Sequence, residues 1–179
     1  MKELLKKSII DCIGTWTDPD IYAISLLVSD DGDNPSKPTV TLGYNTKSNV
    51  KKEKENASST SEARWNYAFW LQNEALRFGC GDTANTVKEW VESQGFTYHD
   101  DIDYEDDEDD EEITQAFVDL LVEIVQEIHQ EKFLKRKFKK ELPILIHELE
   151  YYDEIADQNV KANGKWLVRG FVKWCRSGS

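Results

Sequence analysis

The residues from Asp100 to Glu112 hold the densest group of reactive side chains in the sequence, and we call this stretch the acidic run. Eleven of its thirteen residues are Asp or Glu, and only Ile102 and Tyr104 interrupt them. These carboxylates account for all but two of the thirteen excess negative charges of the chain. Such a block attracts cations and basic proteins, and it repels nucleic acid and anionic membranes.

Three interpretations of the acidic run are open from sequence. It is a solvated loop without a partner, a docking surface for a basic protein, or a site for a divalent cation, for which it has many oxygen ligands. In the docking interpretation, Tyr98 and Tyr104 are the expected aromatic anchors, because a few buried side chains usually dominate affinity. The predicted partner-binding residues are Asp100, Asp101, Asp103, Tyr104, Glu105, Asp106, Asp107, Glu108, Asp109 and Asp110.

The histidines do not form a recognisable metal site. His147-Glu148 begins like the zinc-binding pattern HExxH, but Tyr151 stands where the second His is required. A zinc ion bound to a helix needs two imidazoles on one helical face, so the pattern fails. His99 and His129 have no neighbours at ligand spacing. We therefore predict structural roles for all three histidines and no metal.

Other chemical patterns are equally incomplete. The stretch 30–34 has residue types that bind calcium, but it lacks the order and the closing Glu of an EF-hand loop, and a turn explains it. Carboxylate pairs such as Glu148 and Glu150 could do acid–base chemistry, but chance pairs are certain among 35 acidic residues. Glycine-rich phosphate loops and the nucleophile-elbow pattern are absent. The sequence predicts no catalytic residue and no cofactor.

The composition indicates one folded domain covering residues 1–179. The chain is 32% charged and 39% hydrophobic, and six Trp, seven Tyr and seven Phe supply much of the expected core. We predict that Trp65 and Trp70 are core residues. Three widely spaced cysteines without a CxxC pattern are expected to be reduced thiols.

The expected location is the cytoplasm. The N-terminus is charged and gives no secretion signal, and no apolar run approaches the roughly 18 residues of a membrane span. The net charge of -13 argues against nucleic-acid binding.

Hydrophobic spacing predicts the elements that position these groups. Helices are expected over residues 4–16, between Thr83 and Gly95, and over 113–128, 151–162 and 166–174. Strands are expected over residues 21–29, 39–46 and 143–146, with the first two joined by a long turn at 30–38. Residues 62–78 suggest a strand that turns into a short helix.

Two segments are expected to be loops, namely a polar mobile loop at 47–61 and an acidic loop at 100–112. The stretch from Lys132 to Lys140 has six basic residues of nine. The helix before it is about 24 Å long, which exceeds a Debye length, so we expect the basic and acidic stretches to act independently. The pattern predicts an α+β domain with a small antiparallel or mixed sheet packed against several helices.

Several segments resemble a bacterial family catalogued as domain of unknown function 4303. They are the hairpin that begins with Ile21-Tyr22-Ala23-Ile24-Ser25-Leu26 and closes with Tyr44-Asn45-Thr46, the aromatic stretch Arg64-Trp65-Asn66-Tyr67-Ala68-Phe69-Trp70, and the segment from Ile144 to Asn163. These features are structural rather than catalytic, and the acidic run is not among them. Families of this kind are often encoded near bacterial toxins, and some act as immunity proteins.

The resemblance and the charge together suggest a protein-binding module, namely an immunity protein that neutralises a basic toxin such as a nuclease. One alternative is an enzyme whose pocket lies around Trp65, Trp70 and the carboxylates near Tyr151. Another is a structural or regulatory module without a dedicated ligand. The sequence gives no oligomeric state.

Overall fold

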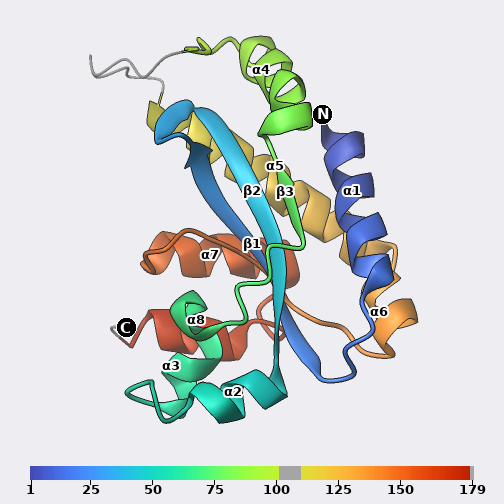
Figure 1. Cartoon of the computed structure of the whole chain (residues 1–179), viewed down its shortest axis with the longest axis vertical. Helices are drawn as coiled ribbons and strands as arrows, with labels where there is room; N and C mark the ends of the chain where they lie inside the picture. Colours follow the sequence, from blue (N-terminus) through green and yellow to red (C-terminus); the bar gives the residue numbers. More distant parts are fainter. Residues whose placement is uncertain (101–109, 178–179) are drawn as a thin grey trace.

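The computed structural model describes residues 1–100 and 110–177, which form a mixed four-stranded sheet with helices around it (Figure 1). The strands are β1 (Ile21–Asp31), β2 (Asn34–Thr46), β3 (Leu76–Phe78) and β4 (Ile144–His147). Their order is β3-β2-β1-β4; β1 pairs antiparallel with β2 and parallel with β4. The α+β class expected from sequence is confirmed.

The described helices form two groups, separated by the undescribed residues 101–109. The first group is α1 (Lys2–Thr15), α2 (Lys47–Glu53), α3 (Thr60–Trp65) and α4 (Ala84–Ser93), with short 3-10 helices η1 (Tyr67–Phe69) and η2 (Gly81–Thr83). The second group is α5 (Asp110–Gln130), α6 (Phe133–Phe138), α7 (Asp153–Asn163) and α8 (Arg169–Cys175). The helices expected near 4–16, 84–94, 113–128, 151–162 and 166–174 are therefore all present.

The two faces of the sheet bury different kinds of side chain. Alternate residues of β1, such as Ile24 and Leu26, enter an aliphatic core shared with α1, α4 and α5. Tyr22 of β1 and Leu145 of β4 enter an aromatic core shared with α2, α3 and α8. Figure 1 shows α2, α3 and α8 together at the lower left of the molecule, away from α1 and α4.

The outer edge of β4 is covered by two asparagine side chains of α7. Asn159 accepts from the backbone N–H of Ile146 at 2.9 Å and donates to its carbonyl at 2.6 Å. Asn163, one turn later, bonds Ile144 in the same way, with both distances 2.8 Å. Each amide thus replaces one residue of a neighbouring strand. This satisfies an edge that would otherwise present unpaired backbone groups.

The turn between β1 and β2 is shorter than the long turn expected at 30–38. Gly32 and Asp33 both have positive φ, 63° and 57°, which is the geometry of a two-residue hairpin turn. Pairing therefore continues to Asp31 and Asn34. Pro35 and Pro38 are tolerated because β3 pairs only with residues 40–42 of β2, so the start of β2 is an edge.

The expected polar loop at 47–61 is wrong in its first half, because residues 47–53 form α2. Thr46 caps this helix by accepting from the N–H of Asn49, and Val50 anchors it in the aromatic core. The expectation of a strand followed by a short helix over 62–78 is also wrong, because the two elements occur in the opposite order. The helix α3 comes first, capped by Ser59, and the strand β3 comes last.

The acidic loop expected at 100–112 ends earlier than predicted, since α5 begins at Asp110. Acidic residues at a helix N-terminus are stabilised by the positive end of the helix dipole, which explains why 110–112 join the helix. The predicted binding residues between 101 and 109 lie outside the described residues.

Candidate functional site

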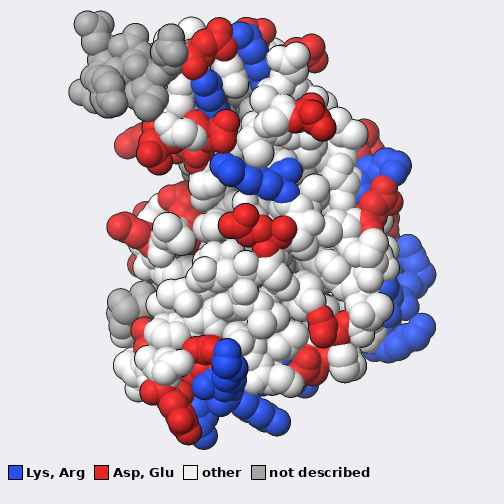
Figure 2. Space-filling view, viewed as in Figure 1, with Lys and Arg blue, Asp and Glu red and all other residues white. Residues whose placement is uncertain are grey.

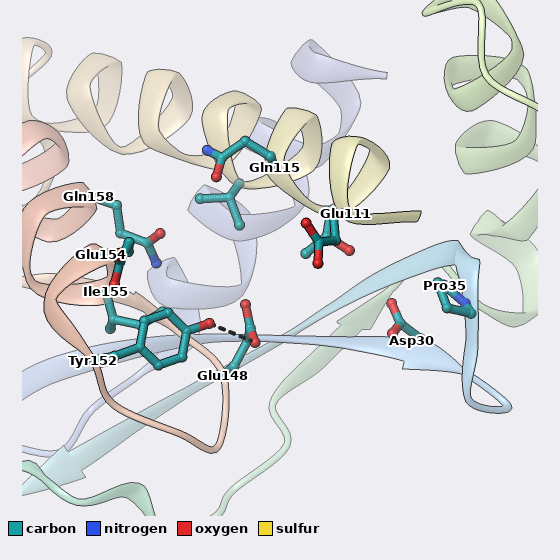
Figure 3. Close-up of a pocket in the computed structure, with 11 residues that line it drawn as sticks. Asp30, Pro35, Glu111, Gln115, Glu148, Tyr152, Glu154, Ile155 and Gln158 are labelled. Atoms are coloured by element: carbon teal, nitrogen blue, oxygen red, sulfur yellow. Dashed lines mark hydrogen bonds between the residues drawn. The ribbon is translucent and has the colours of Figure 1, made fainter. Parts of the chain in front are cut away.

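A cleft opens where the carboxyl ends of β1 and β4 meet the N-terminal turns of α5 and α7 (Figure 3). It consists of two adjoining hollows of about 460 and 400 Å³. Because β1 and β4 are parallel, the residues at their ends emerge at the same edge of the sheet. Asp30, near the end of β1, and Glu148, directly after β4, line both hollows.

Six carboxylates line this cleft, and we call it the acidic cleft. They are Asp30, Asp33, Glu111, Glu148, Glu150 and Glu154. No Lys, Arg or His is among the described residues that line the two hollows. Figure 3 shows Asp30, Glu111 and Glu148 reaching from three different elements toward the same space. In Figure 2, acidic side chains border a notch at the left edge of the molecule from above and below.

Tyr152 gives the acidic cleft an aromatic side chain. It is 43% exposed, and its hydroxyl donates a hydrogen bond to Glu148 at 3.4 Å. The pKa of Tyr152 is raised by partial burial and then by the negative charges of Glu148, Glu154 and Glu150. The environment of this ring therefore favours its neutral form. Leu149, beside it, is 73% exposed.

The sequence does not predict the acidic cleft, because the residues that line it belong only to weak local patterns. From sequence, Glu148 belongs to an incomplete HExxH pattern and, with Glu150, to an acid–base pair expected by chance. Asp30 and Asp33 belong to an incomplete calcium-binding pattern that a turn explains. Nothing local in the sequence shows that they share a site, because the parallel pairing of β1 with β4 brings them together. Among the residues that the structure describes, no group of three or more His, Cys, Asp or Glu is arranged to hold a metal ion.

Of the predicted binding residues, Asp100 and Asp110 lie within the described ranges. The Asp100 carboxylate is 3.3 Å from Lys88 Nζ, and its carbonyl accepts from Lys37 Nζ at 2.5 Å. The same two lysines lie over the ring of Tyr98, at 5.0 and 5.6 Å from its centre. Asp100 is thus already paired with a cation, whereas Asp110 begins α5 one residue before the cleft residue Glu111.

His147 is a core residue, as predicted. It is 2% exposed, and Nδ1 lies 2.7 Å from the carbonyl of Glu148, which can only accept, so Nδ1 carries the proton. Nε2 then accepts from the Ser25 hydroxyl at 2.8 Å. Burial lowers the pKa of His147 to about 4. Although Ser and His form a nucleophile–base pair in many enzymes, Ser25 is 1% exposed and lies out of reach of a substrate.

Trp65 and Trp70 are core residues, as predicted, with 8% and 6% exposure. Trp65 lies directly on Gly170 of α8, where an added Cβ would be 2.9 Å from the indole ring. Trp70 donates from Nε1 to the carbonyl of Arg64 at 3.0 Å. The enzyme alternative placed a pocket around these two side chains and the carboxylates near Tyr151. The aromatic core fills the space around the two indole rings, whereas the nearby Glu148 and Glu150 line the acidic cleft.

Comparison with protein families, curated proteins and solved structures finds no match to this chain. The resemblance to the family named above therefore stays a prediction based on the segments that carry it. No helix in residues 1–100 or 110–177 has the length and apolar character needed to cross a bilayer.

Proposed function

We propose that this protein is a cytoplasmic bacterial binding protein that holds a basic segment of a partner protein in its acidic cleft. We propose further that the partner is a toxin, which the protein neutralises by covering its basic surface. The observation that carries the proposal is a cleft with six carboxylates and no cation among its described lining residues.

Electrostatics supports a basic partner over an anionic one. Carboxylates lining a concave surface concentrate the negative potential there and increase the rate of encounter with a positive surface. The partner's Lys or Arg side chains supply the charges that the cleft lacks. A nuclease is a suitable class of target, because its phosphate-binding surface is basic and a protein bound there blocks the substrate.

Affinity needs more than exposed charge, and Leu149 and Tyr152 supply it. A few desolvated apolar or aromatic side chains usually contribute most of the binding energy of an interface. These two are among the five large hydrophobic side chains that are exposed in the described structure, and both line the acidic cleft. The proposed interface thus has apolar anchors surrounded by carboxylates.

The test begins with affinity capture from the source cells and identification and purification of the captured protein. Its association with wild type is then compared with that of a triple variant, Glu148→Gln, Glu150→Gln and Glu154→Gln. We expect association about tenfold slower at low salt and a much smaller difference at high salt, because salt screens the attraction.

A matched control removes the same charge elsewhere through Glu3→Gln, Glu55→Gln and Glu74→Gln, all exposed residues outside the acidic cleft. This variant should keep association close to wild type, and both variants should unfold within about 0.5 kcal/mol of wild type. Equal slowing by both variants would mean that only net charge matters. An unchanged rate for the cleft variant would overturn the proposal.

A further inference from the structure

The turn between α7 and α8 carries the most exposed large hydrophobic side chain of the described structure. The side chain of Trp166 is 82% exposed, whereas those of Trp65 and Trp174 are 8% and 6% exposed. The turn is closed by a hydrogen bond from the Leu167 N–H to the Gly164 carbonyl at 3.2 Å. Beside Trp166 is an open hollow of about 500 Å³, lined also by Leu167, His129 and Glu141, whose carboxylate is 3.5 Å from His129 Nδ1.

Basic side chains continue from this turn along α8. Arg169 and Lys173 are four residues apart and lie on one side of α8, and Lys165 in the preceding turn is exposed beside the same hollow. They border a second hollow of about 400 Å³ that includes Val160 and Val172. We call Lys165, Trp166, Arg169 and Lys173 the basic corner.

The cations of the basic corner differ from their neighbours. Lys161 is paired with Asp119 at 2.8 Å, and Arg176 with Asp157 at 2.5 Å. The ion pairs around α8 among the described residues involve Lys161 and Arg176. None of them includes Lys165, Arg169 or Lys173. The basic corner therefore combines uncompensated positive charge with an exposed aromatic ring.

These properties complement those of the acidic cleft. The lining of the cleft includes carboxylates such as Glu148 and Glu150, no described Lys, Arg or His, and the exposed side chains Leu149 and Tyr152. The corner has cations and the exposed Trp166. The two surfaces belong to opposite ends of α7, a helix of 11 residues and about 16 Å, so one rigid chain cannot join its own two surfaces.

We propose that the basic corner of one copy docks into the acidic cleft of a second copy. The contact is head-to-tail, because two different surfaces of the same chain meet, and it places Trp166 against Leu149 and Tyr152 of the neighbouring copy. Lys165 and Arg169 then face the carboxylates that surround those side chains. This proposal does not depend on the existence of a basic toxin, although such a partner would compete for the same cleft.

The net charge of -13 opposes self-association at long range. The Debye length is about 10 Å at 0.1 M salt and about 30 Å at 0.01 M, so added salt screens whole-molecule repulsion before it screens contacts at the interface. We therefore expect self-association to be strongest near 0.1 M salt, weaker at 0.01 M, and weak again at 1 M.

The experiment uses sedimentation of the full chain at 0.1 M salt. A corner variant carries Trp166→Ser and Arg169→Ser, and a cleft variant carries Glu148→Gln, Leu149→Ser and Glu150→Gln. Each variant alone should associate at least about tenfold more weakly than wild type. An equimolar mixture of the two should form a 1:1 dimer that does not grow further, because one cleft and one corner remain intact.

The control variant, Lys51→Ser and Lys54→Ser in and after α2, removes two exposed cations that line neither the acidic cleft nor the two hollows of the basic corner, and it should associate like wild type. The proposal is overturned if wild type is monomeric at all concentrations, if the control weakens association as much as the corner variant, or if the mixture of variants stays monomeric. Binding of a basic partner to the corner variant tests the proposed function separately, because its cleft is intact.

Discussion

His147 and Glu148 are neighbours in sequence, but they belong to two regions with opposite properties. The imidazole is buried at 2% exposure, and both of its nitrogens have hydrogen-bond partners. The carboxylate of Glu148 opens into a cleft without a described cation. The first region consists of polar groups satisfied within the fold. The second lines a cleft with carboxylates which, in the proposed function, bind a basic partner.

On the proposed function, this difference separates the residues that carry stability from those that carry recognition. A buried polar group must be satisfied, so its removal damages the fold. Exposed carboxylates contribute little to stability, and their removal affects only what approaches them. Changes on the core side should therefore alter stability without altering the charge of the acidic cleft.

The largest effect is expected for Trp65→Ala. This change removes an indole ring packed on Gly170 and against Tyr22 and Phe171, and it should lower the free energy of unfolding by about 3–5 kcal/mol. Chemical denaturation measures the loss. Below the melting temperature, association with a purified basic partner should remain at the wild-type rate. A stable variant that no longer binds would place Trp65 in the interface.

The next effect is a loss of stability as the pH falls, caused by His147. Its pKa is about 4 in the folded protein against 6.5 for the free side chain, so the unfolded chain binds the additional proton first. Stability is complete above pH 6.5 and falls between pH 6.5 and about 4, by up to roughly 3 kcal/mol. Denaturation of wild type and of His147→Gln across this range isolates the contribution, since all other groups are shared. Parallel curves for the two proteins would show that His147 is not held neutral by burial.

A smaller effect is expected for Asn159→Ala. The change leaves the N–H of Ile146 at the β4 edge without the Asn159 amide, while the Ile146 carbonyl keeps its bond from Gln158 Nε2 at 2.9 Å. The loss should cost about 1–3 kcal/mol. Asp157→Ala on the same helix is a suitable control, because Asp157 is exposed and pairs only with Arg176 at the surface. Equal stability of the two variants would mean that the amide contributes nothing to closing the edge.

Sequence alone predicted the helices and strands whose apolar residues form a clear pattern. The helices α1 and α5 follow from regular spacing of apolar residues, and the strands β1 and β4 follow from short continuous apolar runs. Trp65 and Trp70 follow from the demand for buried area. The prediction for the segment 62–78 was wrong because the spacing of its aromatic residues fits both a strand and a helix. The prediction of a loop over 47–53 was wrong because the Thr46 cap and the buried residues Asn49 and Val50 stabilise a helix despite its polar composition.

The candidate site was only partly predictable for a different reason. The acidic run is visible in sequence because its charges are contiguous, and its role in binding stays a prediction. The acidic cleft draws its carboxylates from positions between Asp30 and Glu154. Only the parallel pairing of β1 with β4 and the placement of α5 and α7 bring them together, and no local pattern encodes that arrangement.

The most direct test of the central claim is to map the interface with a photo-crosslinking amino acid. It is introduced at Leu149 in the acidic cleft and, as a control, at Leu71, which is also exposed but lies outside the cleft. We predict that the protein labelled at Leu149 crosslinks efficiently to a Lys- or Arg-rich segment of the purified partner, and that 1 M salt suppresses the crosslink. Efficient crosslinking from Leu71 with none from Leu149, or a crosslink to an acidic segment, would contradict the account.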